Sequence, residues 1–119
     1  MQTVAKSPEI AVISLKGSLN ATNALEAERD LTTALAQEGS KFLLVDLQQV
    51  DSLDSAGLMA LVSALKVAQQ LKRRLTLCSV SPSLRIIFEL TQLNTVFEIW
   101  EGKAASFIEG TTLSTPRIS

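Results

Sequence analysis

The residues of this chain that could take part in chemistry are concentrated in one short stretch. Between an apolar run that ends at Val45 and a helical pattern that begins near Ser55, the sequence forms a predicted polar bend with three carboxylates and two hydroxyls: Asp46, Asp51, Ser52, Asp54 and Ser55. An oxygen of Asp54 or Ser55 can cap the helix, which contributes around 1 kcal/mol. A hydroxyl at such a bend is also hard to bury, so the stretch presents Ser55 to whatever acts on it.

Most catalytic chemistry is excluded by the residues that the chain lacks. It has no histidine, so a Ser-His-Asp triad, a Cys-His pair and histidine metal sites are ruled out. It also has no glycine-rich dinucleotide loop and no phosphate-binding loop of the P-loop type. We therefore expect no enzyme, no cofactor and no metal.

Two alternatives that use the aspartates are weaker. Asp46, Asp51 and Asp54 could form a magnesium cluster, as in a small phosphotransferase, but their spacing does not follow a calcium loop. Asp46 also superficially resembles the phosphoacceptor of response-regulator receivers. Such receivers need an acidic pair after the first strand, and residues 16–20 contain none.

Phosphorylation of Ser55 fits the physics of a helix start. A phosphate there meets free backbone amides and the positive end of the helix dipole, so the helix need not melt. The group adds about −1.5 to −2 charges beside Asp51 and Asp54. The modification is therefore expected to alter the surface more than the fold.

The neighbouring residues predict a docking surface around this serine. Leu58 and Met59 are expected to add apolar groups to it, and Gly57 is expected to leave the backbone accessible. A phosphate that meets a partner's carboxylate or apolar pocket there would cost several kcal/mol. A penalty near 4 kcal/mol would weaken binding roughly a thousandfold.

Charge and composition limit the remaining partners and the location. The formal net charge of −1 gives no reason to expect nucleic acid or an anionic membrane as a partner. The basic run Lys72–Arg74 is expected to be a solvated helix end, and the single Cys78 a buried, inert thiol. No leader pattern and no membrane-spanning run is found, so we expect a cytoplasmic protein.

Strand and helix patterns alternate along the chain. We predict an edge segment or lead-in over Met1–Pro8, a turn over Gly17–Asn20, strands over Ile10–Leu15, Lys41–Leu47, Leu75–Val80 and Val96–Trp100, and helices over Ala21–Gln37, Ser55–Leu71, from Ser81-Pro82 onward, and over Lys103–Ile108. This order predicts one α/β domain over residues 1–110, with a mixed, mostly parallel sheet of four to five strands packed with about four helices. Residues 111–119 are predicted to be a flexible tail. Asn20, the stretch 46–54 and Ser81 would then gather at the carboxyl ends of the strands.

Three motifs carry a resemblance to one family. The run Leu43–Leu58 resembles the signature of STAS-domain anti-sigma factor antagonists, Gly17–Asn20 matches that family's Gly-x-Leu-Asp turn, and Ser81–Leu93 resembles its third-helix motif. The similarity covers nearly the whole chain. The three motifs together are much more specific than any one of them.

The resemblance implies partner switching in bacterial signal transduction and transcription regulation. An unphosphorylated antagonist binds an anti-sigma factor that is also a serine kinase, the kinase phosphorylates the serine after the motif aspartate, and a PP2C-type phosphatase restores it. In this sequence the acceptor is Ser55. We predict that the partner-binding residues are Leu58, Met59, Ser81 and Pro82.

Two departures from the family pattern concern the acceptor. The family often has a second hydroxyl residue where this chain has Ala56, which leaves Ser55 as the only hydroxyl of the pair. Asn20 stands where the family has aspartate; it can still cap a helix but cannot repel a phosphate. The alternative to the antagonist is a STAS-fold interaction or ligand-sensing module that is never phosphorylated and acts on another target. Self-association through exposed Leu58, Met59 or Trp100 is also left open.

Overall fold

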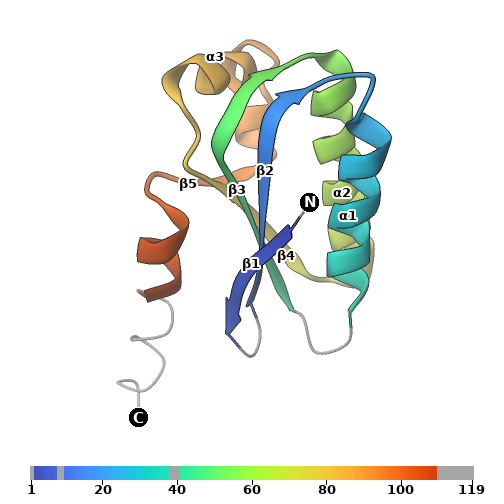
Figure 1. The fold of residues 1–119 in the computed structure, drawn as a ribbon, viewed down its shortest axis with the longest axis vertical. Helices are drawn as coiled ribbons and strands as arrows, with labels where there is room; N and C mark the ends of the chain where they lie inside the picture. Colours follow the sequence, from blue (N-terminus) through green and yellow to red (C-terminus); the bar gives the residue numbers. More distant parts are fainter. Residues whose placement is uncertain (1, 8–9, 38–40, 110–119) are drawn as a thin grey trace.

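The computed structural model of the protein describes residues 2–7, 10–37 and 41–109. Its elements are β1 (Gln2–Ser7), β2 (Ile10–Leu19), α1 (Ala24–Ala36), β3 (Phe42–Leu53), α2 (Ser55–Leu71), β4 (Arg74–Cys78), α3 (Pro82–Leu90), the 3-10 turn η1 (Leu93–Thr95), β5 (Glu98–Trp100) and a helix over residues 104–109 (Figure 1). The predictions for Pro8 and for the tail 111–119 fall outside the described residues.

The strands form one five-stranded sheet in the order β1-β2-β3-β4-β5. β1 is antiparallel to β2, and the pairs β2–β3, β3–β4 and β4–β5 are parallel. The expected α/β fold with a mixed, mostly parallel sheet is confirmed, and the lead-in is an edge strand.

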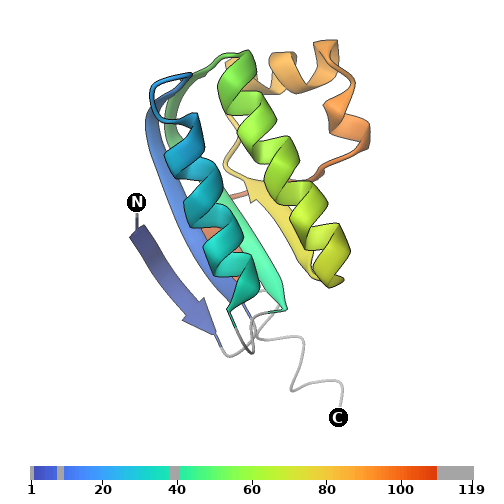
Figure 2. The same cartoon turned by 90° about the vertical axis from the view of Figure 1, so that its right-hand side faces the viewer.

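Both faces of the sheet are covered, as the nearly continuous apolar run of β3 predicts. Helices α1 and α2 lie side by side on one face, and the helix of residues 104–109 lies on the other (Figure 2). The first face holds the larger core, which includes the fully buried Leu31, Leu35, Leu43, Leu61, Leu77, Leu84 and Phe88. On the second face the ring of Phe107 meets Phe42 edge-to-face at 5.2 Å between centroids. Trp100, which is 40% exposed, meets Phe107 in the same way at 5.2 Å.

Strands β2 and β3 are longer than expected. Their pairing continues to Leu19 opposite Leu53, whereas the pairing of β3 with β4 ends at Asp46 opposite Cys78. The predictions of a turn at Gly17–Leu19 and of a polar bend from Gln48 to Leu53 are therefore wrong. The register between the strands shifts twice, so the buried residues Leu47, Val50 and Leu53 recur at every third position. This spacing hides the alternation by which strands are recognised.

The basic run Lys72–Arg74 is more than a solvated helix end. Lys72 takes a left-handed conformation at the end of α2, with φ 58°. The Arg73 guanidinium donates to the main-chain oxygens of Leu35 and of Gln37, the latter at 2.8 Å, and so ties the end of α1 to the end of α2. Arg74 pairs with Glu98 of β5, and this hydrogen bond lowers the pKa of the Glu98 carboxyl. Among the described residues, no helix combines the length and apolar character needed to span a bilayer.

Candidate functional site

Ser55 is the first residue of α2 and lies at the end of the long β3 strand. Asp54 caps the helix, because its Oδ1 accepts a hydrogen bond of 2.9 Å from the Gly57 amide. The predicted cap is therefore confirmed. The Asp54 amide in turn donates to the Leu19 main-chain oxygen at 3.1 Å. The Ser55 side chain is exposed, and its hydroxyl makes no hydrogen bond within the described part of the chain.

Gly57 allows the start of α2 to lie directly against the end of β2. A Cβ atom at Gly57 would lie 2.5 Å from the main-chain oxygen of Leu19 and 2.7 Å from its Cβ. Such distances are well inside van der Waals contact, so a side chain does not fit without a shift. Gly57 is buried, and the expectation that it keeps the backbone accessible to a partner is wrong. The residue is needed for close packing under Ser55.

The apolar residues near Ser55 divide into buried and exposed ones. Leu58 is only 9% exposed and belongs to the core under α2, so its predicted role in a partner surface is wrong. Met59 is 54% exposed and can contribute to one. Leu25, in the first turn of α1, is 75% exposed and was missed. It falls outside the apolar stripe of its own helix, and that spacing could have identified it.

The other hydroxyls and acids at this end of the sheet have different surroundings. Asp51 and Ser52 are exposed on β3, and Ser52 donates to the Ser18 hydroxyl of β2 at 2.9 Å. Ala56 is half-buried. Ser81 caps α3 by accepting from the Leu84 amide at 3.3 Å, while Pro82 is exposed. Ser81 follows β4, whose pairing with β3 ends at Cys78 opposite Asp46, whereas β3 continues to Leu53 before Ser55.

Asn20 directly follows Leu19, whose main-chain oxygen accepts from the Asp54 amide, but its side chain does not cap α1. Its Oδ1 accepts from the amide and the hydroxyl of Thr22, which makes a local turn. The helix begins at Ala24, and Asn23 occupies the cap position without a side-chain cap bond. The predicted start at Ala21 is thus three residues early. The Asn23 side chain instead hydrogen-bonds to the main chain of Asn20 and Ser18.

Asp46 is separate from the other two aspartates. It lies within β3, where its carboxylate accepts from the Ser14 hydroxyl at 3.3 Å and from the Gln48 amide at 3.0 Å. At about 3.3 Å per strand residue, the five positions to Asp51 correspond to roughly 16 Å. Among the described residues, no three His, Cys, Asp or Glu side chains gather in a way that could hold a metal ion.

Cys78 lies next to Asp46 across the β3–β4 pair and is fully buried. Burial, with a contribution from the Asp46 carboxylate, raises the pKa of its thiol from 9.0 to about 12. We expect the native Cys78 thiol to react with a disulfide reagent at pH 8 at least about a hundredfold more slowly than the same thiol in denaturant, because the thiolate is the nucleophile. Equal rates would contradict this expectation.

The raised pKa of Cys78 also links the stability of the fold to pH. The folded state favours the neutral thiol, so the contribution of this group to the free energy of unfolding is present below about pH 9 and is lost as the pH rises towards 12.

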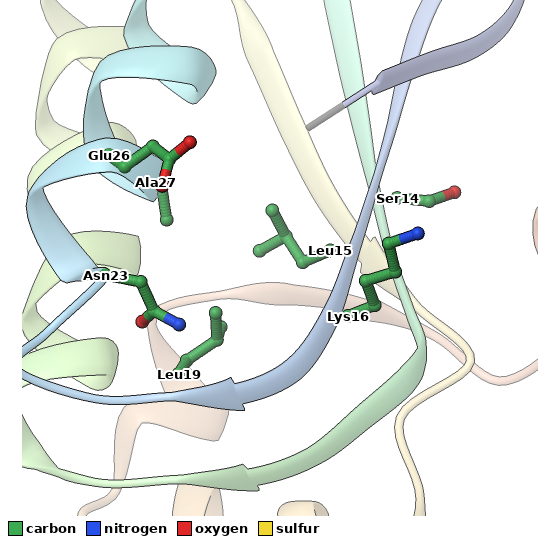
Figure 3. Close-up of a pocket in the computed structure, with 7 residues that line it drawn as sticks. All are labelled: Ser14, Leu15, Lys16, Leu19, Asn23, Glu26 and Ala27. Carbon is green, nitrogen blue, oxygen red and sulfur yellow. The ribbon is translucent and has the colours of Figure 1, made fainter.

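A small pocket borders the site between β2 and α1. It has a volume of about 140 Å³ and is lined by Ser14, Leu15, Lys16, Leu19, Asn23, Glu26 and Ala27 (Figure 3). The Asn23 side chain points towards Leu19 in this view. Ser55 is not among the residues that line this pocket, so the pocket is not the site of the acceptor hydroxyl.

The chain resembles one family in sequence and structure. The model of the STAS domain matches residues 2–105. A putative anti-sigma factor antagonist of Bordetella bronchiseptica, BtrV, is 28% identical over 104 residues, which cover 87% of this chain and 89% of BtrV. An anti-sigma-B factor antagonist of Staphylococcus aureus is 30% identical over 90 residues, which cover 76% and 82% of the two chains.

Solved structures show the same fold. The anti-sigma factor antagonist SpoIIAA in its unphosphorylated form superposes with a TM-score of 0.73 at 19% identity, covering 93% of this chain and 96% of SpoIIAA. The phosphorylated form of the Bacillus protein gives a TM-score of 0.73 at 19% identity, with coverage of 92% and 97%.

Proposed function

The chain belongs to the STAS domain family, and from this premise we propose that it is an anti-sigma factor antagonist controlled by phosphorylation of Ser55. The observation that carries the proposal is the exposed hydroxyl of Ser55, which has no hydrogen-bond partner in the described chain and follows the capping Asp54. The names of the sequence relatives support the antagonist role. In the proposed cycle the unphosphorylated chain binds an anti-sigma factor that is also a serine kinase, and a PP2C-type phosphatase reverses the modification.

The surroundings of the neighbouring hydroxyls favour Ser55 as the acceptor. Ser52 is held in a strand and bonds to Ser18, and Thr22 bonds to Asn20. Ser81 is used as a helix cap. A kinase would have to break these bonds before it could reach those oxygens, whereas Ser55 offers its hydroxyl directly.

The position of Ser55 also suits a reversible charge. The first turn of a helix has free amides and a positive dipole, which favour a phosphate. The nearby carboxylates of Asp51 and Asp54 are exposed, so the added charges raise the local negative field at the surface. The fold is retained while the surface changes, which is what a binding switch requires.

The proposed docking surface consists of Ser55 with the exposed side chains of Leu25, Met59 and Pro82. Leu25 and Met59 lie near the starts of α1 and α2, which pack side by side with both starts at the same end of the molecule. Exposed apolar groups around a hydroxyl allow a partner to bury the serine. A phosphate in the middle of this contact opposes that burial. The kinase supplies ATP, magnesium and base, so this chain is substrate and ligand, not catalyst.

Phosphorylation by the partner kinase tests the acceptor. The kinase is identified by capture from the host on immobilised Ser55→Ala chain, which is predicted to stay in the binding-competent state. With that kinase and ATP, the wild-type chain is expected to gain one phosphate by intact mass, and Ser55→Ala to gain none.

The variant Ser52→Ala is the control, because it removes the nearest rival hydroxyl and should still gain one phosphate. Stoichiometric phosphorylation of Ser55→Ala would refute the assignment. A stable complex that never phosphorylates the chain and ignores substitutions at Ser55 would favour an unphosphorylated STAS interaction module.

A further inference from the structure

The side-chain carboxamide of Asn23 hydrogen-bonds to the main chain of the residues on either side of Leu19, the last residue of β2. Its Oδ1 accepts from the Asn20 amide at 2.9 Å, and its Nδ2 donates to the Ser18 oxygen at 2.8 Å. One side chain thus supplies a donor and an acceptor, as the peptide group of a neighbouring strand would. Aspartate could supply only the acceptor, and alanine neither.

These two hydrogen bonds lie at the end of β2 where the neighbouring edge strand β1 no longer pairs with it. Within the described residues, the pairing of β1 with β2 reaches only Gln2 opposite Ser14, whereas β2 continues to Leu19. The Asn23 carboxamide takes the place of a strand at the end of this edge. It does so although Asn23 stands at the cap position of α1, where its side chain makes no cap bond.

Leu19, which lies between these two hydrogen-bonded residues, is in direct contact with the start of α2. Its main-chain oxygen accepts from the Asp54 amide at 3.1 Å, and its backbone and Cβ lie directly under Gly57. Its own side chain is 4% exposed. Leu19 therefore fixes the positions of Asp54, immediately before Ser55, and of Gly57, two residues after it.

We propose that Asn23 is a positioning residue for phosphorylation of Ser55: by clamping Ser18 and Asn20 it fixes Leu19, and through Leu19 it fixes the first turn of α2. The inference rests on the proposed function for the identity of the acceptor. Within the described chain the Asn23 side chain hydrogen-bonds to Asn20 and Ser18 and not to the acceptor hydroxyl, so its loss should affect the geometry of the acceptor more than docking.

The first test measures the clamp without a kinase. Site-resolved amide exchange by NMR is compared among the wild-type chain, Asn23→Ala, Asn23→Asp and the matched controls Asn94→Ala and Asn94→Asp. Asn94 is exposed in η1 and makes no side-chain hydrogen bond in the described chain. We expect the Asp54 amide to exchange at least about tenfold faster in Asn23→Ala, with a smaller increase in Asn23→Asp, which keeps the acceptor. Rates are normalised to the core amides of Leu44 and Val45, which separates local opening from global destabilisation.

The second test measures positioning with the kinase captured by the Ser55→Ala chain. We expect Asn23→Ala to lower kcat at least about tenfold with KM within about twofold, and the Asn94 variants to leave both unchanged. Unchanged Asp54 exchange would overturn the clamp, and faster exchange with unchanged kcat would overturn the positioning role. Failure of the proposed function is distinguishable, because the wild-type chain itself would then gain no phosphate on Ser55.

Discussion

Phosphorylation of Ser55 is expected to weaken the complex with the anti-sigma factor kinase about a thousandfold, and Ser55→Asp at least tenfold. The phosphate adds about −1.5 to −2 charges at the centre of the docking surface, and aspartate adds −1. Placing this charge against a desolvated partner surface costs about 4 kcal/mol for the phosphate and about 1.4 kcal/mol or more for the carboxylate. Titration calorimetry with the purified kinase, without ATP, measures the dissociation constants.

Two variants make this result specific. Ser55→Ala keeps the surface uncharged and should bind within a few-fold of the wild-type chain. Ser106→Asp adds the same charge at an exposed serine of the helix 104–109, on the opposite face of the sheet, and should also bind normally. An unfolding midpoint of Ser55→Asp near that of wild type would show that the fold is retained, since acids suit the first turn of a helix. Wild-type affinity of Ser55→Asp would exclude the charge switch.

Gly57→Ala is expected to lower the free energy of unfolding by about 1–2 kcal/mol, the overpacking cost less the gain in helix propensity. Adding a methyl group within a helix normally stabilises it by roughly 0.5–1 kcal/mol. Here the new Cβ would lie 2.5 Å from the main-chain oxygen of Leu19, and backbone cannot move aside as a flexible side chain can. Overpacking of this kind costs about 1–3 kcal/mol. Urea unfolding followed by circular dichroism measures the difference.

The neighbouring substitution Ala56→Gly provides the control for helix propensity. Ala56 is half-buried, and its replacement should cost only about 0.5–1 kcal/mol. If Gly57→Ala proved neutral or stabilising, the close approach of α2 to Leu19 would be refuted. The Cβ added by Gly57→Ala should displace the start of α2 and with it Ser55. We therefore expect the kinase to phosphorylate this variant more slowly than its remaining folded fraction alone would predict.

The sequence allowed the fold and the acceptor to be predicted where the signals are local. The alternation of strands and helices indicates the parallel sheet, and Asp54 before a helical pattern indicates the cap that the structure confirms. The lack of histidine excludes most catalytic roles, and the position of Ser55 at the start of a helical pattern indicates an accessible hydroxyl that another protein modifies. The boundaries of β2 and β3 were not predictable in the same way, because their shifted register replaces simple alternation.

The environment of Ser55 depends on contacts between residues far apart in the chain. Nothing local to Gly57 distinguishes a surface glycine from a buried one; only the approach of α2 to Leu19 does. The burial of Leu58, by contrast, agrees with its helical spacing to Leu61 and Leu65. Likewise, Asn23 has the sequence position of a helix cap, and the open edge of β2 gives its side chain another partner.

The sequence by itself thus determined the elements, their order and the serine that opens α2, since propensities and caps act over a few residues. The tertiary structure alone decided that Gly57 is buried, that Asp46 stands apart, and that Leu19 supports the site. These are results of packing β2 against α2, and packing depends on distances that no local pattern encodes.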